Sequence, residues 1–472
     1  MTMILWAIIL SASFSAVAAV DPIHLPLRYT QRSSKSISRR ALSNSVPIYN
    51  AVMQGGYAID LSIGTPGQNF SVILDTGSTE LWVPGPSCPK TECFSTLFNP
   101  QASTTFVATT DPISLVYGVG SDNGTYGRDT VTLGGYQVQN QTFGVISSAA
   151  NNSSPVVGEP YLNGLLGLAF PSLTYAYKTR KAEYDPFVFA LWKQNQIPQP
   201  IFSIYLGAKT AAGESGQVTF GGIDTTKFSG NLQWLQVQME TYPNTAANYY
   251  HWNIRLVGLA ATLNGKQSSN LLGATSQIVA LDTGTTLSYM SQQVVVNMLK
   301  VIAPNAIYVQ GIYVVDCTLA TATGTVDFAF GNTTDSTNAV LLSAPISSLV
   351  LPADTNSIST AQTCVWGIVP IDIKELGTYL LGDTFLQSVY VVHDFENHVV
   401  GMASASWTNL TSSSNVAAAS ASAASGSAAG SSASTTSKGG SNNGGSPISS
   451  GSAALHPMTG FALVGCLCFL LL

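Results

Sequence analysis

Short apolar runs separated by turn residues make up most of the chain. Residues 57–63 alternate apolar and polar positions, residues 64–67 form a Gly-Thr-Pro-Gly turn, and Phe70 to Leu74 are the next apolar run. Alternation of period two, bounded by Gly and Pro, predicts half-buried strands. Further turns are predicted at Gly134-Gly135, Gly221-Gly222, Asn264-Gly265 and Gly311. Convincing helical patterns are confined to residues 186–194 and 291–303, so the sequence predicts an all-β protein.

Residues 115–126 predict a β-hairpin. The pair Asn123-Gly124 is of the type that two-residue hairpin turns favour, so we place the turn there. The same stretch contains Gly118 and Gly120, a Gly-x-Gly pattern that also occurs in phosphate-binding loops. No strand-to-helix transition follows it, so a phosphate site is not supported.

Two apolar runs end in the same polar sequence. Residues 72–74 lead into Asp75-Thr76-Gly77-Ser78, and residues 278–281 lead into Asp282-Thr283-Gly284-Thr285. A carboxylate at the end of a buried strand needs hydrogen-bond donors, which the hydroxyls and the Gly backbone supply. One copy alone would be interpreted as an ordinary Asx turn at a strand end. Two copies with the same apolar approach indicate two similar halves that each bring one aspartate to a shared site.

The N-terminus has targeting and processing signals. Residues 1–18 resemble a secretory signal peptide without the usual basic start, and a membrane-spanning anchor, the alternative, would need about 20 apolar residues. Residues 19–40 hold five basic residues and one acid, whereas the whole chain has a net charge of −6. This charge contrast favours a removable basic pro-segment that neutralises an acidic cleft, with processing at Arg39-Arg40. The alternative is an unstructured basic tail.

The C-terminus is a low-complexity stretch followed by an apolar tail. Residues 408–451 are rich in Ser, Ala and Gly, which cannot bury a core, so we expect a flexible stalk that is a candidate for O-glycosylation. Residues 452–472 form a spacer and an apolar run. Together with small residues around Asn443, they predict a GPI attachment signal with Asn443 as the candidate attachment residue. The alternative, a short single-pass anchor, is disfavoured by length.

The composition limits the possible binding partners and indicates the cellular compartment of the protein. Charged residues are only 9% of the chain and form no basic patch in its body, so we expect no nucleic-acid partner. The five His are scattered and form no cluster with Cys, so the sequence does not indicate a metal site. Six cysteines fit an oxidising compartment: Cys88 and Cys93 are close enough for a small loop, Cys317 and Cys364 remain as a second pair, and two more lie in the apolar tail.

Glycosylation sequons, which are acceptor sites only where exposed, lie at Asn69, Asn123, Asn140, Asn151, Asn152, Asn332 and Asn409.

These motifs, in this order, resemble the pepsin-like aspartic proteases over about residues 55–405. After the first Asp-Thr-Gly come Leu81-Trp82-Val83-Pro84, the Cys88–Cys93 loop, Tyr117-Gly118 on the hairpin, and Arg128-Asp129-Thr130-Val131. Residues 163–168 and 379–383 resemble the two apolar-apolar-Gly segments that brace the catalytic loops of the family. Cys317 and Cys364 fall where the family has a disulfide in its second lobe. The leader and the Ser-rich tail further resemble cell-surface members found in fungi.

The resemblance implies a bilobal all-β fold, with a cleft between an N-terminal lobe (residues 41–230) and a C-terminal lobe (residues 231–407). It implies that Asp75 and Asp282 are catalytic and that their neighbours support them, namely Thr76, Gly77, Ser78, Thr283, Gly284 and Thr285. Tyr117 and Gly118 would lie on a flap over the substrate, with Trp82 steadying the Tyr117 hydroxyl. The alternatives are cross-strand packing for Tyr117 and core packing for Trp82. No cofactor is implied.

Two carboxylates at one site cannot both ionise freely, a behaviour for which pepsin-like enzymes are the standard example. Over an acidic range one aspartate is then a base that activates water, and the other is an acid that protonates the peptide carbonyl. No covalent intermediate is needed. Which of the two holds the proton is left open, because the pair titrates jointly.

We therefore expect a monomeric endopeptidase that acts on proteins or peptides and is secreted or held at the cell surface by a GPI anchor. Val119 is apolar where some relatives carry a polar residue, which favours hydrophobic residues on both sides of the scissile bond. A glycan on Asn123, at the predicted turn, would obstruct closure of the flap. The rival function is a catalytically silent binding or adhesion module, against which the intact aspartates and hydroxyls argue. A structural glycoprotein with coincidental motifs is remote, and no Gly-x-Ser-x-Gly elbow supports a serine hydrolase.

Overall fold

The computed structural model describes residues 22–30, 56–93, 96–117, 120–150, 164–207, 214–242, 245–334, 338–354, 357–372, 377–408 and 410. The predicted signal peptide, the leader after residue 30, the stalk after residue 410 and the tail lie outside these residues. The same holds for Gly118, Val119, Asn151, Asn152, Asn409 and Asn443. Within the described ranges no helix is long and apolar enough to cross a membrane.

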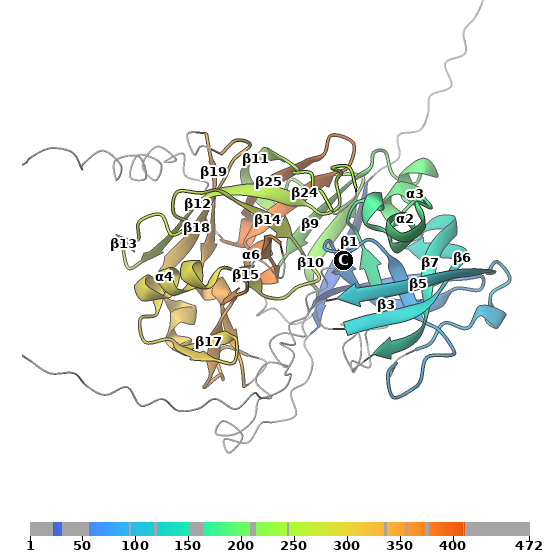
Figure 1. The fold of residues 1–472 in the computed structure, drawn as a ribbon, viewed down its shortest axis with the longest axis horizontal. Coiled ribbons are helices and arrows are strands. Elements are labelled where there is room, and N and C mark those ends of the chain that lie inside the picture. Colours follow the sequence, from blue (N-terminus) through green and yellow to red (C-terminus); the bar gives the residue numbers. More distant parts are fainter. Residues whose placement is uncertain are drawn as a thin grey trace, which may run out of the picture.

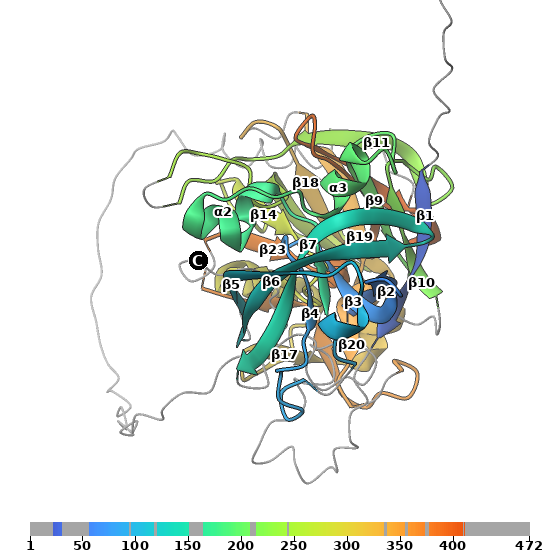
Figure 2. The same ribbon diagram turned by 90° about the vertical axis from the view of Figure 1, so that its right-hand side faces the viewer.

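One large sheet, with 13 strands among the described residues, runs from the N-terminal lobe into the centre of the molecule (Figure 1). The strands of the N-terminal lobe are, in sheet order, β2 (Gly56–Ile63), β3 (Gln68–Asp75), β8 (Leu165–Gly167), β4 (Leu81–Pro84), β7 (Tyr136–Ala150), β6 (Gly120–Leu133) and β5 (Val107–Tyr117). The central strands come from both halves of the chain: β11 (Phe228–Gln236), β25 (Val399–Ala405), β24 (Val389–Asp394), β9 (Ile201–Leu206), β10 (Glu214–Phe220) and β1 (Ile23–Thr30). Figure 2 turns the N-terminal lobe toward the viewer, with β5, β6 and β7 on its near side.

The C-terminal lobe contains two further sheets. The larger has the order β19 (Val340–Pro345), β18 (Gly324–Phe330), β12 (Asn253–Leu263), β14 (Gln277–Leu281), β23 (Tyr379–Leu381), β15 (Ser288–Met290) and β22 (Ile368–Pro370), with β13 (Lys266–Gln267) paired to β12. The smaller has the order β16 (Ile307–Val309), β17 (Ile312–Val315), β21 (Cys364–Trp366) and β20 (Val350–Pro352). Two β-lobes joined by central strands confirm the predicted bilobal all-β fold.

Several predicted turns and both predicted helices are confirmed. The hairpins β6–β7, β12–β13 and β16–β17 each turn through two residues at positive φ, ending in Gly135, Gly265 and Gly311. Such turns match the twist of the flanking strands, which explains the Gly and Asn found there. The predicted helices are α3 (Phe187–Lys193) and α4 (Gln292–Ile302). Two short helices, α2 (Tyr175–Arg180) and α6 (Asp383–Leu386), have no clear sequence signal.

The predicted hairpin turn at Asn123-Gly124 is wrong. β5 pairs with β6 so that Tyr117 faces Gly120, and Asn123 lies three residues into β6, half-buried. Gly124 instead lies at a β-bulge against β7, where a Cβ would be 2.1 Å from the carbonyl oxygen of Val145. Close approach of a neighbouring strand therefore explains this glycine. A glycan on Asn123 would project from within the strand and not from the tip of the hairpin.

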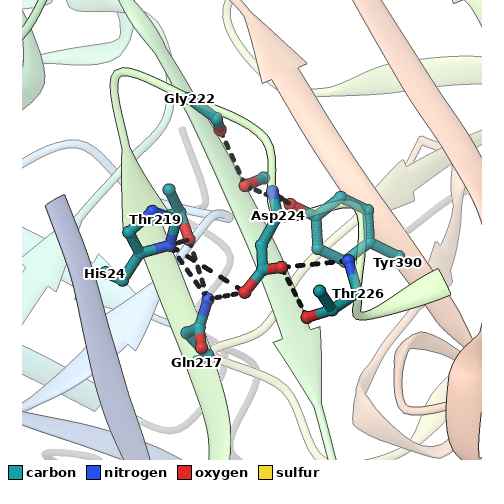
Figure 3. A network of polar contacts seen from close by, with 8 residues as sticks. His24, Gln217, Thr219, Gly222, Asp224, Thr226 and Tyr390 are labelled. Carbon is teal, nitrogen blue, oxygen red and sulfur yellow. Dashed lines mark hydrogen bonds and ion pairs between the residues drawn. The ribbon is translucent and has the colours of Figure 1, made fainter. Parts of the chain in front are cut away.

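Part of the predicted leader is a strand of the central sheet, because β1 lies between β10 and β2. Its His24 contacts Thr219 at 2.9 Å and Gln217 at 3.2 Å (Figure 3). The Gln217 amide donates to Asp224 at 2.9 Å, and the Asp224 backbone N–H donates to the Tyr390 hydroxyl of β24 at 2.7 Å. A polar network thus joins the described part of the leader to strands from both halves of the chain.

Two disulfides and a buried cluster of aromatic rings stabilise the lobes. Both predicted disulfides, Cys88–Cys93 and Cys317–Cys364, are present. Between the lobes, the buried rings of Phe202 and His393 stack at 4.4 Å, and Trp252 packs edge-on against His393 at 4.8 Å. Phe202 and His393 belong to the central strands β9 and β24, and Trp252 immediately precedes β12. Rings from separate segments therefore bury a common core beneath the candidate site.

Candidate active site

The two predicted aspartates lie at the ends of equivalent strands. β3 ends at Asp75, and β14 ends one residue before Asp282. Each of these strands pairs in parallel with a short apolar strand, β3 with β8 and β14 with β23. Each short strand also pairs in antiparallel fashion with the strand that follows the aspartate, β4 or β15. The repeated sequence motif therefore folds into a repeated local topology.

A glycine at the end of each bracing strand, or directly after it, lets the aspartate loop approach closely. A Cβ on Gly167 of β8 would lie 2.3 Å from the backbone carbon of Thr79. A Cβ on Gly382, directly after β23, would lie 2.3 Å from the carbonyl oxygens of Thr285 and Leu287. No side chain fits at either position, so the apolar-apolar-Gly segments fix both loops through backbone contact.

The two loops bind each other through the threonines of the motif. The Thr76 hydroxyl accepts the backbone N–H of Thr283 at 3.0 Å and donates to the carbonyl of Leu281 at 2.9 Å. The Thr283 hydroxyl accepts the backbone N–H of Thr76 at 3.1 Å and donates to the carbonyl of Leu74 at 2.7 Å. These four buried bonds are related by an approximate two-fold, so they fix the loops of the two lobes against one another.

The carboxylate of Asp75 has a donor on each oxygen. Its Oδ1 accepts the backbone N–H of Gly77 at 2.8 Å, and its Oδ2 accepts the Ser78 hydroxyl. Gly77 also lies against the second loop, because a Cβ there would be 2.6 Å from Cγ of Asp282. The glycine is therefore required for contact between the two loops, a reason that the sequence did not reveal.

Asp282 has the matching set of donors. Its Oδ1 accepts the backbone N–H of Gly284 at 2.8 Å, and its Oδ2 accepts the Thr285 hydroxyl at 2.5 Å. Burial raises the pKa of Asp75 well above its ordinary value, and the charge of Asp282 adds to this rise. Burial also raises the pKa of Asp282, while its hydrogen bonds act against the rise. The pair therefore keeps a proton to higher pH than two isolated aspartates would.

The predicted contact between Trp82 and Tyr117 is present. The Trp82 Nε1–H donates to the Tyr117 hydroxyl at 2.9 Å, and both side chains are buried. Trp82 lies on β4, the first strand after the loop of Asp75, and Tyr117 is the last residue of β5. Both also pack in an apolar cluster with Ile113 and Leu115, so packing and hydrogen bonding occur together. Gly118 lies outside the described residues.

Comparison with known proteins decides the family. The family model described as eukaryotic aspartyl protease matches residues 56–405. The chain belongs to this family. The chain is 32% identical to mucorpepsin of Rhizomucor miehei over 377 residues, which cover 78% of this chain and 83% of the relative. It is also 32% identical to gastricsin of Rattus norvegicus (75% and 82% covered) and to pepsin A of Suncus murinus (76% and 82% covered).

Membership of the aspartyl protease family confirms the predicted enzyme class, an aspartic endopeptidase that hydrolyses peptide bonds. The match covers both motifs and the strands that hold them. Proteins and peptides are accordingly its class of substrate.

The described sequons differ in their surroundings. Asn69 and Asn140 are exposed on β3 and β7, and Asn140 has a φ of 54°. Asn332 is exposed as well, and its side-chain oxygen accepts the backbone N–H of Gln236 at 2.8 Å. Three of the described sequons therefore lie where a glycan could be accommodated, and Asn123 is more enclosed.

Glu80, a buried acid five positions after Asp75, was not among the residues predicted from the sequence. Its Oε1 accepts the Tyr126 hydroxyl at 3.0 Å and the backbone N–H of Tyr175 at 2.6 Å. Burial raises the pKa of Glu80 to about 7. A glutamate is ordinarily exposed unless it is paired, so nothing in the sequence indicated that this one is buried.

A second group of buried charged residues that was not predicted from the sequence includes His251 and Glu240. The Nδ1 of buried His251 contacts both carboxylate oxygens of Glu240, at 2.9 and 3.1 Å. Burial lowers the pKa of Lys178 in α2 to about 8, while the charges of Glu80 and Glu240 act in the opposite direction. These residues are far apart in the chain and follow no motif, so no sequence signal could have brought them together.

Proposed function

We propose that Asp75 and Asp282 are the catalytic residues of this aspartic endopeptidase. The observation that carries the proposal is that two buried carboxylates, each with donors on both oxygens, are delivered to one place by equivalent strands. At acidic pH the pair holds one proton. The ionised member takes a proton from a water as it attacks the peptide carbonyl, and the protonated member donates to the carbonyl oxygen.

The neighbouring residues have supporting roles in this proposal. Thr76 and Thr283 keep the two loops in register, and Ser78 and Thr285 orient the carboxylates by their hydrogen bonds. Preorganised donors need no rearrangement during the reaction, which is the main source of electrostatic stabilisation in enzymes. Tyr117, held by Trp82, closes over the bound peptide together with Gly118.

We further propose a preference for hydrophobic residues on both sides of the scissile bond. The apolar Val119, two residues after Tyr117 in the sequence, supports it, since it offers no charge to a basic side chain. A working range at acidic pH follows from the requirement that one aspartate keep its proton.

The proposed life cycle is that of a secreted zymogen. Residues 1–18 direct secretion, the basic segment 19–40 is removed at Arg39-Arg40, and the lobes span residues 41–230 and 231–407. The Ser-rich stalk and the tail then tether the enzyme by a GPI anchor at Asn443, as in cell-surface members found in fungi. The alternative function is a catalytically silent binding module of the same fold on the cell surface, which the stalk and tail would serve equally well.

The test compares the native protein with the variants Asp75→Asn and Asp60→Asn, of which the second changes an exposed aspartate on β2. Each leader-free protein meets a diverse peptide mixture from about pH 3 to pH 7, and cleavage sites are read by mass spectrometry. We expect acid-dependent cuts with the native chain and with Asp60→Asn, and none with Asp75→Asn. Folded native protein that cuts nothing at any pH would favour the binding module instead.

A further inference from the structure

A polar hollow lies in the N-terminal lobe, and no residue of the aspartate loops lines it. It is lined by Arg128 of β6, by residues 139–142 of β7, and by α3 with the segment that precedes it. Its volume is about 420 Å³. This is within the range of about 300–1,000 Å³ that is usual for small-molecule sites. The hollow is therefore large enough to hold a ligand of the size of one sugar.

Asn140 lies on a β-bulge at the wall of this hollow. The register between β6 and β7 shifts here, so that Gln139 and Asn140 lie opposite the single residue Thr130. Asn140 has a φ of 54°, in the left-handed region that Asn tolerates better than most residues. A bulge of this kind changes the direction of a side chain relative to the regular strand. Asn140 is exposed and lines the hollow.

Hydrogen bonds fix the bulge to α3. The side chain of Gln194, the residue that caps the C-terminus of α3, accepts the backbone N–H of Gln139 at 2.9 Å and donates to its carbonyl at 2.9 Å. Gln141 is 2% exposed and donates to the carbonyl of Asp185 at 3.1 Å. The Asp185 carboxylate in turn pairs with Lys193 of α3 at 2.5 Å. The walls of the hollow are therefore held in place before any ligand binds.

The charges of the lining favour a neutral ligand. Lys193 is neutralised by Asp185, which leaves Arg128 as the one unpaired cation among the described lining residues. Arg128 is exposed and pairs with Thr142 across the two strands. Its guanidinium makes no hydrogen bond or ion pair with the part of the chain that the structure describes. It thus has five N–H donors to offer to the oxygens of a ligand.

Asn140 is also the first residue of the sequon Asn140-Gln141-Thr142. We propose that the hollow is a saccharide site, and that the first N-acetylglucosamine of an N-linked glycan on Asn140 occupies it. Because Asn140 itself lines the hollow, the sugar begins at its wall. The Arg128 guanidinium donates to the hydroxyl or acetamide oxygens of this sugar. The inference goes beyond catalysis and rests only on the secretion in the proposed life cycle.

The glycan reaches Asn140 by an ordinary transfer. The side-chain amide nitrogen bonds to the anomeric carbon of an oligosaccharide, the bond from that carbon to a polyprenyl diphosphate carrier breaks, and the amide loses one proton. Once the chain has folded, the bound sugar contacts both β7 and α3 and joins them. Asn69 and Asn332 are exposed sequons that are not part of this hollow, so they serve as internal controls.

The first experiment measures how well each glycan is protected from an enzyme. The full chain is produced with its own signal peptide in a eukaryotic host that keeps its glycans in the oligomannose form. The folded glycoprotein then meets endoglycosidase H, which cleaves between the first two sugars, with an aspartic protease inhibitor present to prevent self-digestion. Mass spectrometry follows the trimming at each sequon. We expect Asn140 to be trimmed about tenfold more slowly than Asn69, as for a sugar that is outside the hollow in about one molecule in ten.

Two pairs of variants test the role of the hollow. Arg128→Ala should bring the trimming rate at Asn140 to within about twofold of the rate at Asn69, because the sugar loses its charged donor. Lys181→Ala removes an exposed cation that does not line the hollow and should change nothing. Asn140→Asp removes the sequon with a residue that also tolerates positive φ, and Asn69→Asp is its matched control. Amide hydrogen exchange in residues 136–142 and 187–194 should become faster in Asn140→Asp alone.

The outcomes separate this inference from the proposed function. Absence of a glycan at every sequon would contradict the proposed secretion, whereas Asn140 unmodified beside a glycosylated Asn69 or Asn332 overturns the saccharide site. Trimming at Asn140 as fast as at Asn69 overturns it too. Slow trimming that Arg128→Ala leaves unchanged would show shielding by the protein surface alone. Peptide cleavage enters neither measurement, so loss of the catalytic proposal would leave the result as it stands.

Discussion

The Thr76 hydroxyl accepts the backbone N–H of Thr283 at 3.0 Å, and the Thr283 hydroxyl accepts the backbone N–H of Thr76 at 3.1 Å. Each lobe therefore supplies both a donor and an acceptor to the other. The threonines that do so directly follow Asp75 and Asp282 in the sequence. The position of one carboxylate relative to the other is set by this exchange, because the residues concerned are buried and exclude competing water.

Thr76→Ala should destabilise the protein by about 2–4 kcal/mol, since it removes the partner of a buried N–H and of a buried C=O. Thr76→Ser, which keeps the hydroxyl, is the matched control and should cost much less. Denaturant unfolding of both variants at acidic pH measures the difference. Equal stability of the Ala and Ser variants would show that the hydroxyl does not hold the lobes together.

The native protein should lose stability as the pH rises from about 4.5 to about 7, and Glu80→Gln should abolish this loss. The pKa of Glu80 is raised from 4.5 to about 7 in the folded protein, mainly by burial. In this range the folded state binds more protons than the unfolded state, so native stability falls as the pH rises and is unaffected well below pH 4.5. The effect amounts to about 3 kcal/mol at neutral pH.

The measurement for Glu80 is the free energy of unfolding over that pH range, for the native chain, Glu80→Gln and the exposed control Glu183→Gln. The Gln side chain can still accept from the Tyr126 hydroxyl and from Tyr175, so the fold is retained. Parallel pH curves for native protein and Glu80→Gln would mean that Glu80 does not titrate in this range.

The sequence predicted the parts of the site that a local motif encodes. Both aspartates follow apolar strands, and their glycines and hydroxyls recur at the same spacing, so their shared environment could be expected before the structure was known. The turn at Asn123-Gly124 was wrong because an Asn-Gly pair is a local signal, and the pairing of β6 with both neighbours overrides it. His251 and Glu240 depend on tertiary contacts between segments without a motif, which no pattern in one sequence encodes.

Asp75→Asn and Asp282→Asn should each reduce kcat/KM by about 10²- to 10⁴-fold, the usual contribution of a general acid or base. Asn keeps the size of the side chain and can still accept from Ser78 or Thr285, so the unfolding temperature should change little. Peptide cleavage and thermal unfolding are measured on the same preparations. Full activity in either variant would remove that aspartate from the mechanism.

Trp82→Phe should reduce kcat/KM by about 2- to 10-fold, the effect of losing one buried hydrogen bond to the Tyr117 hydroxyl. Tyr117→Phe removes the other half of the same bond and should have a similar effect. If the bond acts by holding the tyrosine over the peptide, the double variant should be little worse than either single one, because both changes remove the same interaction. Activities that multiply instead would mean that the two residues act independently, Trp82 by packing in the core and Tyr117 by contact with the substrate. The shape of the pH profile should stay the same in all three variants, since none of them changes a charge near the aspartates.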